Sequence, residues 1–311
     1  MRVAIIGAGA VGLYLAWKLS ERGREVTVFE QKKKIGQDIC SGLFSKKIFE
    51  FIPASEGLVK NKINFVLLHF PKKTVRVNFS KDFFIISHFE LDNLLADLAK
   101  KAGVKIVLNQ KISRFPQGYD RIIGCDGANS FIRRGLGLKE PKYRLGALNI
   151  EKIAENCSPP NGGEQFSAIS NYVEVWPCKN GFSWKIPRGE NIEQGAIKEL
   201  GSFKGVDFLR AKARIIPQGL IIPSNPLITL CGDAAGLTKP WSGGGVVWGL
   251  IAAEILLKSF PDFLKYHKEI KKFFIPKIVL SKTATKIVYF LGFKAPWLLS
   301  KTTKIESDFL L

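Results

Sequence analysis

The chain has 311 residues, 46% of them hydrophobic, with 47 lysine and arginine residues against 27 acidic residues and a formal net charge of +20. The apolar share is ample for a globular protein, and the length is more typical of two domains than of a single core. The positive charge favours an anionic partner, such as a phosphorylated ligand or a membrane surface, but no recognisable nucleic-acid-binding motif accompanies it, so we expect no nucleic-acid partner.

A strand, a glycine-rich turn and a helix are predicted at the start of the chain. The apolar residues 2–6 predict a buried strand, residues 12–22 predict a helix, and the segment "EVTVFE" predicts a second strand that ends at Glu30. This order and spacing are typical of a β-α-β unit. The same residues have the outline of a signal peptide, but they fit a nucleotide-binding turn better.

The turn after the first strand has the pattern G-x-G-x-x-G, formed by Gly7, Gly9 and Gly12. In this pattern the first glycine permits a tight turn, the second lets the backbone approach a pyrophosphate, and the third lets the helix pack on the strand. The pyrophosphate would lie at the helix N-terminus, and Glu30 would accept hydrogen bonds from ribose hydroxyls. The pattern therefore predicts a bound dinucleotide, without separating FAD from NAD.

A region of a different type interrupts the buried strands. A hairpin is predicted around Pro71 and a helix over residues 90–103, and from about 142 to 200 apolar runs separated by proline and glycine predict an antiparallel sheet. The segment "PLITLCGD" returns to the buried type. The apolar stretch 241–257 is short for a membrane span and contains Glu254, which favours a buried helix.

These elements predict an α/β chain with a discontinuous Rossmann-like nucleotide-binding domain, an antiparallel-sheet substrate domain and a helical C-terminal tail. The nucleotide-binding domain would comprise residues 1–64, 80–138 and 217–260, the substrate domain residues 65–79 and 139–216, and the basic C-terminal region residues 261–311.

Two further predicted strands end in an acid followed by glycines. The segment "GCDGANSFIRR" contains Asp126 and Gly127, and "CGDAAGLTKPWSGGG" contains Asp233 and ends in the glycines 243–245. Two such turns, far apart in the sequence, suggest one long ligand held at several points. FAD has that length: an acid would accept hydrogen bonds from its ribityl hydroxyls, and the glycines would admit the flavin ring and direct N–H groups at its carbonyl edge.

These three segments together resemble the FAD-binding fold of the para-hydroxybenzoate hydroxylase type, and more narrowly the chain resembles the geranylgeranyl reductase family over roughly residues 1–260. Archaeal members of that family saturate the isoprenoid chains of membrane lipids. The segment "CSGLFS", beginning at Cys40, lies where the family has a flavin-proximal cysteine motif. The segment "FSWKIP", residues 182–187, resembles an aromatic and tryptophan motif of the substrate sheet, with Ile186 in place of the usual aromatic residue. His88 lies near a position where the family often has arginine.

The resemblance implies three catalytic residues, a larger set of cofactor-binding residues and no metal site. The implied catalytic residues are Cys40, Trp184 and Trp241. The implied FAD-binding residues are Gly7, Gly9, Val11, Gly12, Glu30, Cys40, Ser41, Gly42, His88, Asp126, Gly127, Asp233, Gly243, Gly244 and Gly245.

The resemblance also implies the reaction. An FAD-dependent oxidoreductase of this kind would reduce geranylgeranyl double bonds of a prenylated lipid or a prenyl diphosphate by hydride transfer from the flavin and protonation. The chain has no second G-x-G-x-x-G pattern, so electrons would come from transiently bound NAD(P)H or a small electron carrier. Two alternatives on the same fold are an FAD-dependent monooxygenase of aromatic or lipophilic substrates and a non-enzymatic prenyl-binding protein. A quinone-linked electron-transfer flavoprotein is disfavoured, because the five cysteines lack iron–sulfur spacing.

The C-terminal region is rich in lysine. From Lys258 to Lys304 there are eleven lysines and two acids, a local net charge of +9. This predicts peripheral contact with an anionic membrane, and a solubilising face is the alternative. The aromatic residues expected at the lipid interface are Phe273, Phe274, Tyr289, Phe290 and Trp297. Five scattered cysteines without a C-x-x-C pair favour reduced thiols, so we expect a cytoplasmic, peripherally membrane-associated protein.

Overall fold

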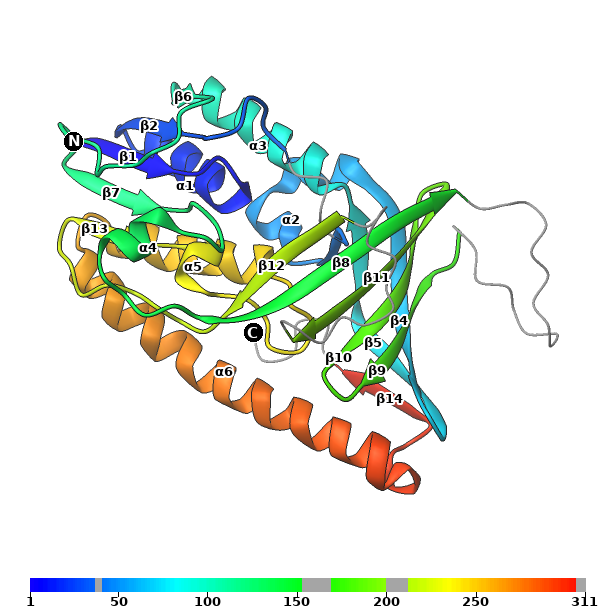
Figure 1. The fold of residues 1–311 in the computed structure, drawn as a ribbon. Helices are drawn as coiled ribbons and strands as arrows, with labels where there is room; N and C mark the ends of the chain where they lie inside the picture. The colour runs from blue at the N-terminus through cyan, green and yellow to red at the C-terminus, as the bar shows by residue number, and fades with distance from the viewer. Residues whose placement is uncertain (37–40, 153–168, 200–211, 306–311) are drawn as a thin grey trace. The chain divides into compact units, whose positions relative to one another are not determined.

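The computed structural model describes residues 1–36, 41–152, 169–199 and 212–305 (Figure 1). The strands of these residues form two sheets. One sheet has five parallel strands, and the other has nine strands, most of them antiparallel. The chain forms two compact units. The first unit comprises residues 1–38, 88–143 and 215–283, and the second comprises residues 39–87, 144–214 and 284–311. The predicted α/β class, with one Rossmann-like sheet and one antiparallel sheet, is confirmed.

The first unit contains the parallel sheet and the helices that pack on it. The strands, in the order in which they pair, are β13 (Ile228–Leu230), β7 (Arg121–Gly124), β1 (Arg2–Ile6), β2 (Glu25–Phe29) and β6 (Lys105–Val107). The helices are α1 (Ala10–Glu21), α3 (His88–Lys101), α4 (Phe131–Gly135), the short 3-10 turn η2 (Gly232–Ala235), α5 (Val246–Ser259) and the N-terminal part of α6 (Phe263–Lys294).

Helix α1 begins directly after the glycine turn, and its apolar residues are buried around most of its circumference. Leu13, Leu15 and Leu19 are fully buried. On the α5 side, the Tyr14 hydroxyl donates a 2.6 Å hydrogen bond to the Glu254 carboxylate. Burial of the Tyr14 hydroxyl and this carboxylate raise the pKa of Tyr14 well above its ordinary value. Glu254, the residue that argued against a membrane span, is thus a hydrogen-bond partner of α1. Helix α5 is largely buried, as predicted.

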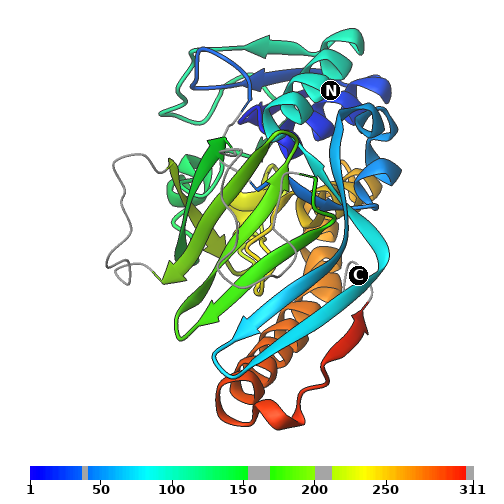
Figure 2. The same ribbon diagram turned by 90° about the vertical axis from the view of Figure 1, so that its right-hand side faces the viewer.

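The second unit is built on long strands that lie side by side as one curled sheet (Figure 2). The strands, in pairing order, are β12 (Lys212–Gln218), β8 (Lys142–Lys152), β11 (Asn191–Glu199), β10 (Gly181–Arg188), β9 (Tyr172–Cys178), β4 (Val59–Phe70), β5 (Lys73–Ile86) and β14 (Thr302–Ile305), with β3 (Leu43–Ser45) paired to β5. The short helices α2 (Ile48–Phe51), η1 (Pro53–Leu58) and η3 (Pro296–Leu298) complete the described elements. The chain passes between the two units within β8, β12 and α6.

The observed units differ from the predicted domain boundaries in two places. Residues 41–64 and 80–87 lie in the second unit, because β4 and β5 continue well beyond the predicted hairpin as part of the large sheet. The C-terminal region is divided between the two units: α6 runs from the first into the second, and β14 pairs in parallel with β5. No strand was expected in the lysine-rich end of the chain, since its polar residues give no apolar alternation.

Among the described helices, none is both long enough and apolar enough to cross a lipid bilayer. Helix α6 has 32 residues, and its buried positions recur at helical spacing: Phe263, Tyr266, Ile270 and Phe274 are at most 1% exposed. Phe274 lies against Trp248 of α5, with ring centroids 5.2 Å apart. The N-terminal half of α6 is therefore part of the core of the first unit.

We predict a large difference between two neighbouring phenylalanines of α6. Phe274→Ala removes a fully buried ring and should lower the free energy of unfolding by about 3–5 kcal/mol, whereas Phe273→Ala, at 36% exposure, should lower it by about 1 kcal/mol or less. Urea denaturation followed by circular dichroism measures both. Equal losses in the two variants would contradict the placement of Phe274 in the core.

Candidate functional site

The parallel strands of the first unit end in register. Ile6, the last residue of β1, pairs with Phe29 of β2 on one side and with Gly124 of β7 on the other. Gly124 in turn pairs with Leu230, the last residue of β13. The carboxyl ends of four neighbouring strands therefore lie along one edge of the sheet, where ligands of open α/β sheets bind.

The residues that follow these strand ends are the ones singled out in the sequence. In the order of the sheet they are Asp233 after β13, Asp126 after β7, Gly7 after β1 and Glu30 after β2. Segments more than 200 residues apart in the sequence, at Gly7 and Asp233, are thus brought to one edge of one sheet. A ligand that runs along this edge would meet all four.

The glycine turn is closed too tightly for any side chain. A Cβ atom on Gly7, whose φ is +106°, would lie 2.4 Å from the carbonyl oxygen of Cys125, and one on Gly12 would lie 2.1 Å from the carbonyl oxygen of Gly7. Gly9 is the N-cap of α1, and the first turn of the helix contains no acid. The first N–H groups of α1 are therefore available to an anion, which fits a pyrophosphate.

Glu30 fixes the glycine turn as well as facing the ligand edge. Its Oε2 accepts a 2.8 Å hydrogen bond from the Ala8 N–H, and its Oε1 accepts one of 2.9 Å from the Lys32 N–H. A carboxylate has about four acceptor sites, so each oxygen retains capacity for a ribose hydroxyl. The contact with Ala8 was not anticipated from the sequence, in which the two residues are 22 positions apart.

Asp126 has one satisfied and one unsatisfied oxygen. Its Oδ2 accepts a 3.1 Å hydrogen bond from the Ile132 N–H at the start of α4, whereas its Oδ1 is buried and has no hydrogen-bond partner among the described residues. Burial raises the pKa of the Asp126 carboxyl, and the Ser130 hydroxyl and backbone N–H groups oppose this shift. A buried acceptor without a donor is costly, so this oxygen fits a hydroxyl group of a bound cofactor.

The glycines before α5 make room for a protein carboxylate. A Cβ atom on Gly245, the N-cap of α5, would lie 2.5 Å from Oδ1 of Asp233. The carboxylate of Asp233 therefore lies at the N-terminus of α5, where the helix dipole favours a negative charge. The sequence interpretation, in which these glycines admit a flavin ring and direct N–H groups at its carbonyl edge, did not include this role. Gly244 has only the Ser242 hydroxyl nearby, at 3.4 Å from a Cβ position, and it leaves space at the turn.

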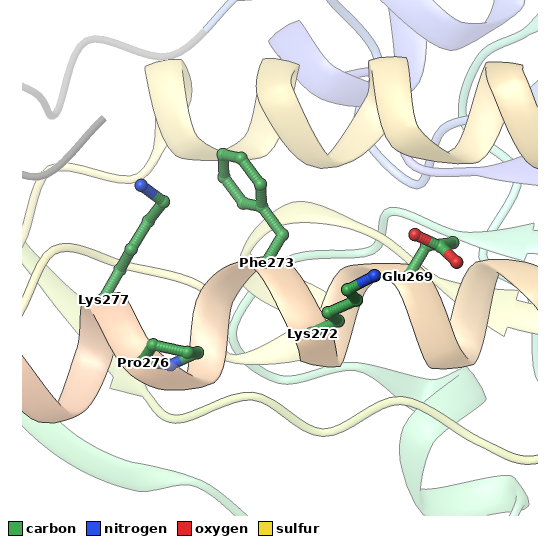
Figure 3. A pocket seen from close by; sticks show the side chains of 5 residues that line it. All are labelled: Glu269, Lys272, Phe273, Pro276 and Lys277. Atoms are coloured by element: carbon green, nitrogen blue, oxygen red, sulfur yellow. The ribbon is translucent and has the colours of Figure 1, made fainter.

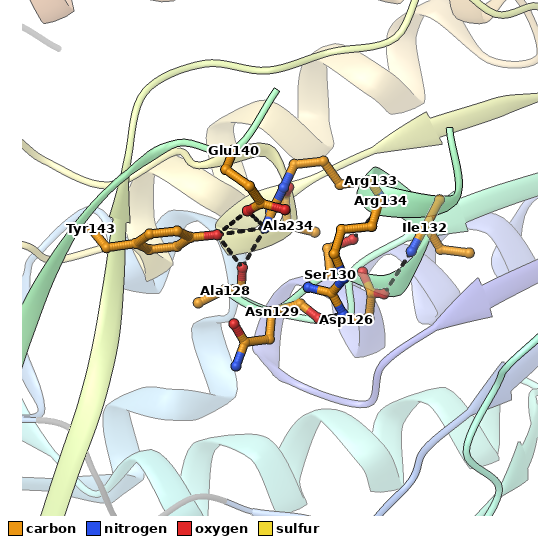
Figure 4. A network of polar contacts seen from close by, with 10 residues as sticks. All are labelled: Asp126, Ala128, Asn129, Ser130, Ile132, Arg133, Arg134, Glu140, Tyr143 and Ala234. Carbon is orange, nitrogen blue, oxygen red and sulfur yellow. Dashed lines mark hydrogen bonds and ion pairs between the residues drawn. The ribbon is translucent and has the colours of Figure 1, made fainter. Parts of the chain in front are cut away.

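A buried arginine joins the two acid turns (Figure 4). The Arg133 side chain is fully buried, and its guanidinium donates 2.8 Å and 2.7 Å hydrogen bonds to the carbonyl oxygens of Ala234 and Ala128. It also contacts the Glu140 carboxylate at 2.7 Å and the Tyr143 hydroxyl at 2.8 Å. Hydrogen bonding to the Tyr143 hydroxyl and the charge of Arg133 lower the pKa of Glu140, against a smaller effect of desolvation.

Arg133 therefore positions the turn that carries Asp233 relative to the turn that carries Asp126. No role for Arg133, Glu140 or Tyr143 was predicted from the sequence. Arg133 lies shortly after Asp126 in the chain, within α4. Its partners at positions 140 and 234 cannot be found from local spacing.

Other predicted FAD-binding residues lie at several places in the two units. Val11 packs its methyl groups against Gly232 and Gly249, where a Cβ on Gly249 would lie 2.5 Å from Cγ2 of Val11. His88 begins α3 and is buried, with Nε2 3.4 Å from the Asp92 carboxylate. Its predicted flavin contact remains a proposal.

The cysteine segment is only partly described. Cys40 lies outside the described residues, so its proposed catalytic and flavin contacts remain proposals. Ser41 and Gly42 follow in the second unit, and the Gly42 carbonyl oxygen accepts a 2.9 Å hydrogen bond from the Ile86 N–H of β5. A Cβ atom on Gly42 would lie 2.3 Å from the Ile86 carbonyl oxygen, which accounts for a glycine there.

The two tryptophans proposed as catalytic lie in different units. Trp241 belongs to the first unit, with its ring centroid 5.8 Å from that of Trp248 and the Lys239 ammonium 5.8 Å above it. Trp184 belongs to β10 of the second unit and is 7% exposed.

The Trp184 indole is held by residues of β11. It lies over Gly195 of β11, where a Cβ atom would be 2.2 Å from the ring, and its Nε1 donates a 3.0 Å hydrogen bond to Oε1 of Glu193. The other oxygen of Glu193 accepts from the Arg188 guanidinium. Burial raises the pKa of the fully buried Glu193, and Arg188 and the indole N–H oppose that shift. The sequence motif identified Trp184 but not Glu193 and Arg188, which hold it.

Comparisons with known proteins agree with this geometry. A family model described as an NAD(P)-binding Rossmann-like domain matches residues 5–49. A digeranylgeranylglycerophospholipid reductase of Methanococcus vannielii is 24% identical over 83% of this chain and 77% of its own. The kynurenine 3-monooxygenase of Anopheles gambiae is 26% identical over 84% of this chain and 67% of its own. The crystal structure of a geranylgeranyl bacteriochlorophyll reductase-like protein from Thermoplasma acidophilum superimposes with a TM-score of 0.74 at 18% identity, covering 96% and 88% of the two chains.

The predicted resemblance to the geranylgeranyl reductases is confirmed. The fold is that of the FAD-dependent oxidoreductases, and enzymes of that kind, one of them with FAD bound, are among the solved structures that share it. The predictions of an oxidoreductase fold and of FAD as its cofactor are therefore confirmed. The matches to both a reductase and a monooxygenase leave the reaction to be argued from this chain's own residues.

We predict that Gly12→Ala lowers the FAD content of the purified protein. The new methyl group would lie 2.1 Å from the Gly7 carbonyl oxygen and would displace the turn that receives the pyrophosphate. Gly57→Ala is the matched control, since nothing lies within 4 Å of its Cβ position. The ratio of oxidised-flavin absorbance to protein absorbance measures occupancy, and equal ratios in the two variants would refute the assignment of the turn.

Proposed function

We propose that this protein is an FAD-dependent reductase that saturates the isoprenoid double bonds of a prenylated lipid or prenyl precursor. The relatives named digeranylgeranylglycerophospholipid reductase and the reductase-like solved structure support this proposal. One structural observation carries it. The sheet face around Trp184 is apolar, and the Glu193 carboxylate on it is paired with the Trp184 indole and the Arg188 guanidinium.

The residues of that face follow from the register of the strands. Cross-strand partners share a face, so Trp184 lies beside Val175 of β9 and Gly195 of β11, and Gly195 lies beside Leu148 of β8. Phe182 and Ile186, two positions to either side of Trp184, lie on the same face. Among these described residues the exception is Glu193, whose oxygens are occupied by Trp184 and Arg188. This part of the sheet suits an apolar chain, which is held by buried area.

A cation lies farther along the same face. Arg144 is four positions before Leu148 in β8, so the two side chains lie on one side of the sheet. Burial lowers the pKa of the Arg144 guanidinium, and Tyr289 and Glu199 oppose this shift. Since a guanidinium is well suited to phosphate, an apolar face with a cation on it matches an isoprenoid chain attached to an anionic headgroup.

The chemistry needs both a hydride donor and stabilisation of positive charge. Bound FAD would supply hydride when it is reduced. An isolated alkene is poorly polarised, and its more substituted carbon becomes positively charged as it is reduced. The aromatic faces of Phe182 and Trp184, with centroids 5.8 Å apart, would stabilise that charge. The hydrogen bond to Glu193 keeps the indole in one orientation, so no reorganisation is needed when charge develops.

The proposal extends to the partners of the reaction. NAD(P)H or a small electron carrier would reduce the flavin, and the lipid substrate would be reached from a membrane surface. Cys40 is proposed as a catalytic residue by its motif alone.

The second candidate is a monooxygenase of an aromatic or lipophilic substrate, favoured by the match to a kynurenine 3-monooxygenase. The two reactions differ in their need for oxygen, because a monooxygenase transfers an oxygen atom from O2 to the substrate and a reductase transfers hydrogen alone.

We predict that the dithionite-reduced protein, mixed under argon with a geranylgeranylated lipid, recovers the spectrum of oxidised flavin and yields a lipid that has gained two hydrogens for each double bond reduced. Absorbance and mass spectrometry measure the two changes. The same lipid in its fully saturated form is the control and should leave the flavin reduced. Flavin that stays reduced with the unsaturated lipid, but is oxidised by air in the presence of a phenol that gains oxygen, would overturn the reductase in favour of the monooxygenase.

We further predict that Trp184→Ala slows alkene reduction by on the order of tenfold to thirtyfold, the loss expected for a buried cation–π contact, with FAD content unchanged. Trp176→Ala is the matched control. Trp176 lies on the neighbouring strand opposite Ser183, so it belongs to the other face of the sheet. Single-turnover reoxidation rates measure both variants, and equal rates would remove Trp184 from the substrate face.

A further inference from the structure

Helix α6 has a second, exposed apolar stripe opposite its buried one. Two of the aromatic residues expected at a lipid interface are not available to lipid. Phe274 is fully buried, and the largely buried Tyr289 donates a 3.0 Å hydrogen bond to the Gly181 carbonyl oxygen. Burial raises the pKa of Tyr289 to about 12. Phe273, Phe290 and Trp297 are exposed as expected.

The exposed stripe consists mainly of aliphatic residues that the sequence analysis did not select. Their intervals of three, four and seven positions place them on one side of the helix. They are Ile275, Val279, Leu280, Ile287 and Phe290, and each is between 46% and 63% exposed. We call this set, together with the exposed lysines Lys272, Lys282 and Lys286 on the same side of the helix, the outer face of α6. Because all of these residues belong to one helix, the helical repeat alone defines the face.

The outer face carries charge of a single sign. Between Glu269 and Glu306 the sequence contains eight lysines and no acid. Exposed apolar residues in a contiguous group are unusual on a soluble surface and mark a contact site. Lysines around apolar residues on one side of a helix are the composition of helices that lie in the headgroup region of anionic bilayers.

A cavity of about 420 Å³ adjoins the outer face at its N-terminal end, lined by Glu269, Lys272, Phe273, Pro276 and Lys277 (Figure 3). The Lys277 ammonium lies 4.7 Å from the centroid of the Phe273 ring. The two ammonium groups outnumber the single Glu269 carboxylate in this lining, so they would offer a headgroup phosphate a net positive charge, and the aromatic ring and the proline would offer the adjoining acyl chain an apolar contact.

We propose that the outer face of α6 docks this protein on the surface of an anionic lipid bilayer. The aliphatic residues and Phe290 enter the headgroup boundary, and the lysines contact lipid phosphates. The proposal deepens the lipid-reductase function, on which its choice of partner rests.

The charge pattern favours a bilayer over a second copy of the chain. Two copies joined through this face would bring lysines against lysines, with no acid on the face to pair with them. A bilayer containing anionic lipid supplies both an apolar layer and a dense opposite charge.

The test is co-sedimentation of the full-length holoprotein with vesicles of phosphatidylglycerol or of phosphatidylcholine. We expect binding to the anionic vesicles that weakens as salt rises, since the Debye length shortens, and little binding to the zwitterionic ones. Replacing Lys272, Lys282 and Lys286 by glutamine should weaken the binding and reduce its salt dependence.

The apolar contribution has its own matched pair of variants. Val279→Asp and Phe290→Asp should each weaken binding by about tenfold or more, because each puts a charge where apolar area is buried. Leu227→Asp is the control: Leu227 is 54% exposed in the first unit, outside α6, and the variant has the same change in net charge. Flavin content and circular dichroism confirm that the variants are folded.

Three outcomes would overturn the proposal. They are equal binding to both kinds of vesicle at all salt concentrations, equal weakening by Phe290→Asp and Leu227→Asp, and a wild-type dimer that ignores vesicles and dissociates on Phe290→Asp in sedimentation velocity. Binding needs no turnover, whereas reduction of a detergent-dispersed lipid needs no bilayer. A protein that reduces the detergent-dispersed lipid but does not bind vesicles therefore rejects the docking face alone. A protein that binds vesicles but does not reduce the lipid rejects the reductase alone.

Discussion

The cofactor edge of the first unit depends on one buried guanidinium. Arg133 holds the carbonyl oxygens of Ala128 and Ala234, and so it fixes two turns that are about 100 residues apart in the sequence. Glu140 and Tyr143 also contact the guanidinium, which keeps its charge paired, although its Nε–H has no hydrogen-bond partner among the described residues. Only the guanidinium is buried, since the Glu140 side chain is 43% exposed, so the two buried carbonyl contacts depend on Arg133 more than the ion pair does. The acids that face a ligand can therefore remain incompletely satisfied, since other residues hold the backbone that carries them.

The glycine turn and the strands around it could be predicted from the sequence because their determinants are local. Gly7, Gly9 and Gly12 are within six positions of one another, and the local geometry leaves no room for a side chain at Gly7 or Gly12. The period of the apolar residues likewise predicts α1. The second contact of Glu30, with Ala8, depends on the pairing of β1 with β2, and the reason for Gly245 depends on where Asp233 lies. Both are contacts between elements, which a local pattern does not contain.

The same limit separates the correct from the incorrect expectations in the C-terminal helix and the substrate sheet. Phe273 and Phe274 are adjacent aromatic residues in a lysine-rich stretch, and composition cannot distinguish them. The angle of about 100° between consecutive helical residues turns Phe274 toward Trp248 and Phe273 away from it. Trp184 was found by its motif, whereas Glu193 was not, because a glutamate in a strand is normally exposed. It is buried here only because Trp184 and Arg188 together satisfy both of its oxygens.

The two units use their polar groups in opposite ways, and this difference bears on substrate choice. At the edge of the parallel sheet, Asp126 has an oxygen without a donor and Glu30 retains acceptor capacity, which suits a ligand rich in hydroxyl groups. Around Trp184, the carboxylate of Glu193 is already paired on both sides. A substrate hydroxyl placed there would lose its hydrogen bonds to water without gaining new ones, at a cost of about 1–3 kcal/mol for each group. An alkene loses nothing in the same place. In the reductase that we propose, a preference for an alkene over a phenol would come from the sheet around Trp184, through the pairing of Glu193 with Trp184 and Arg188.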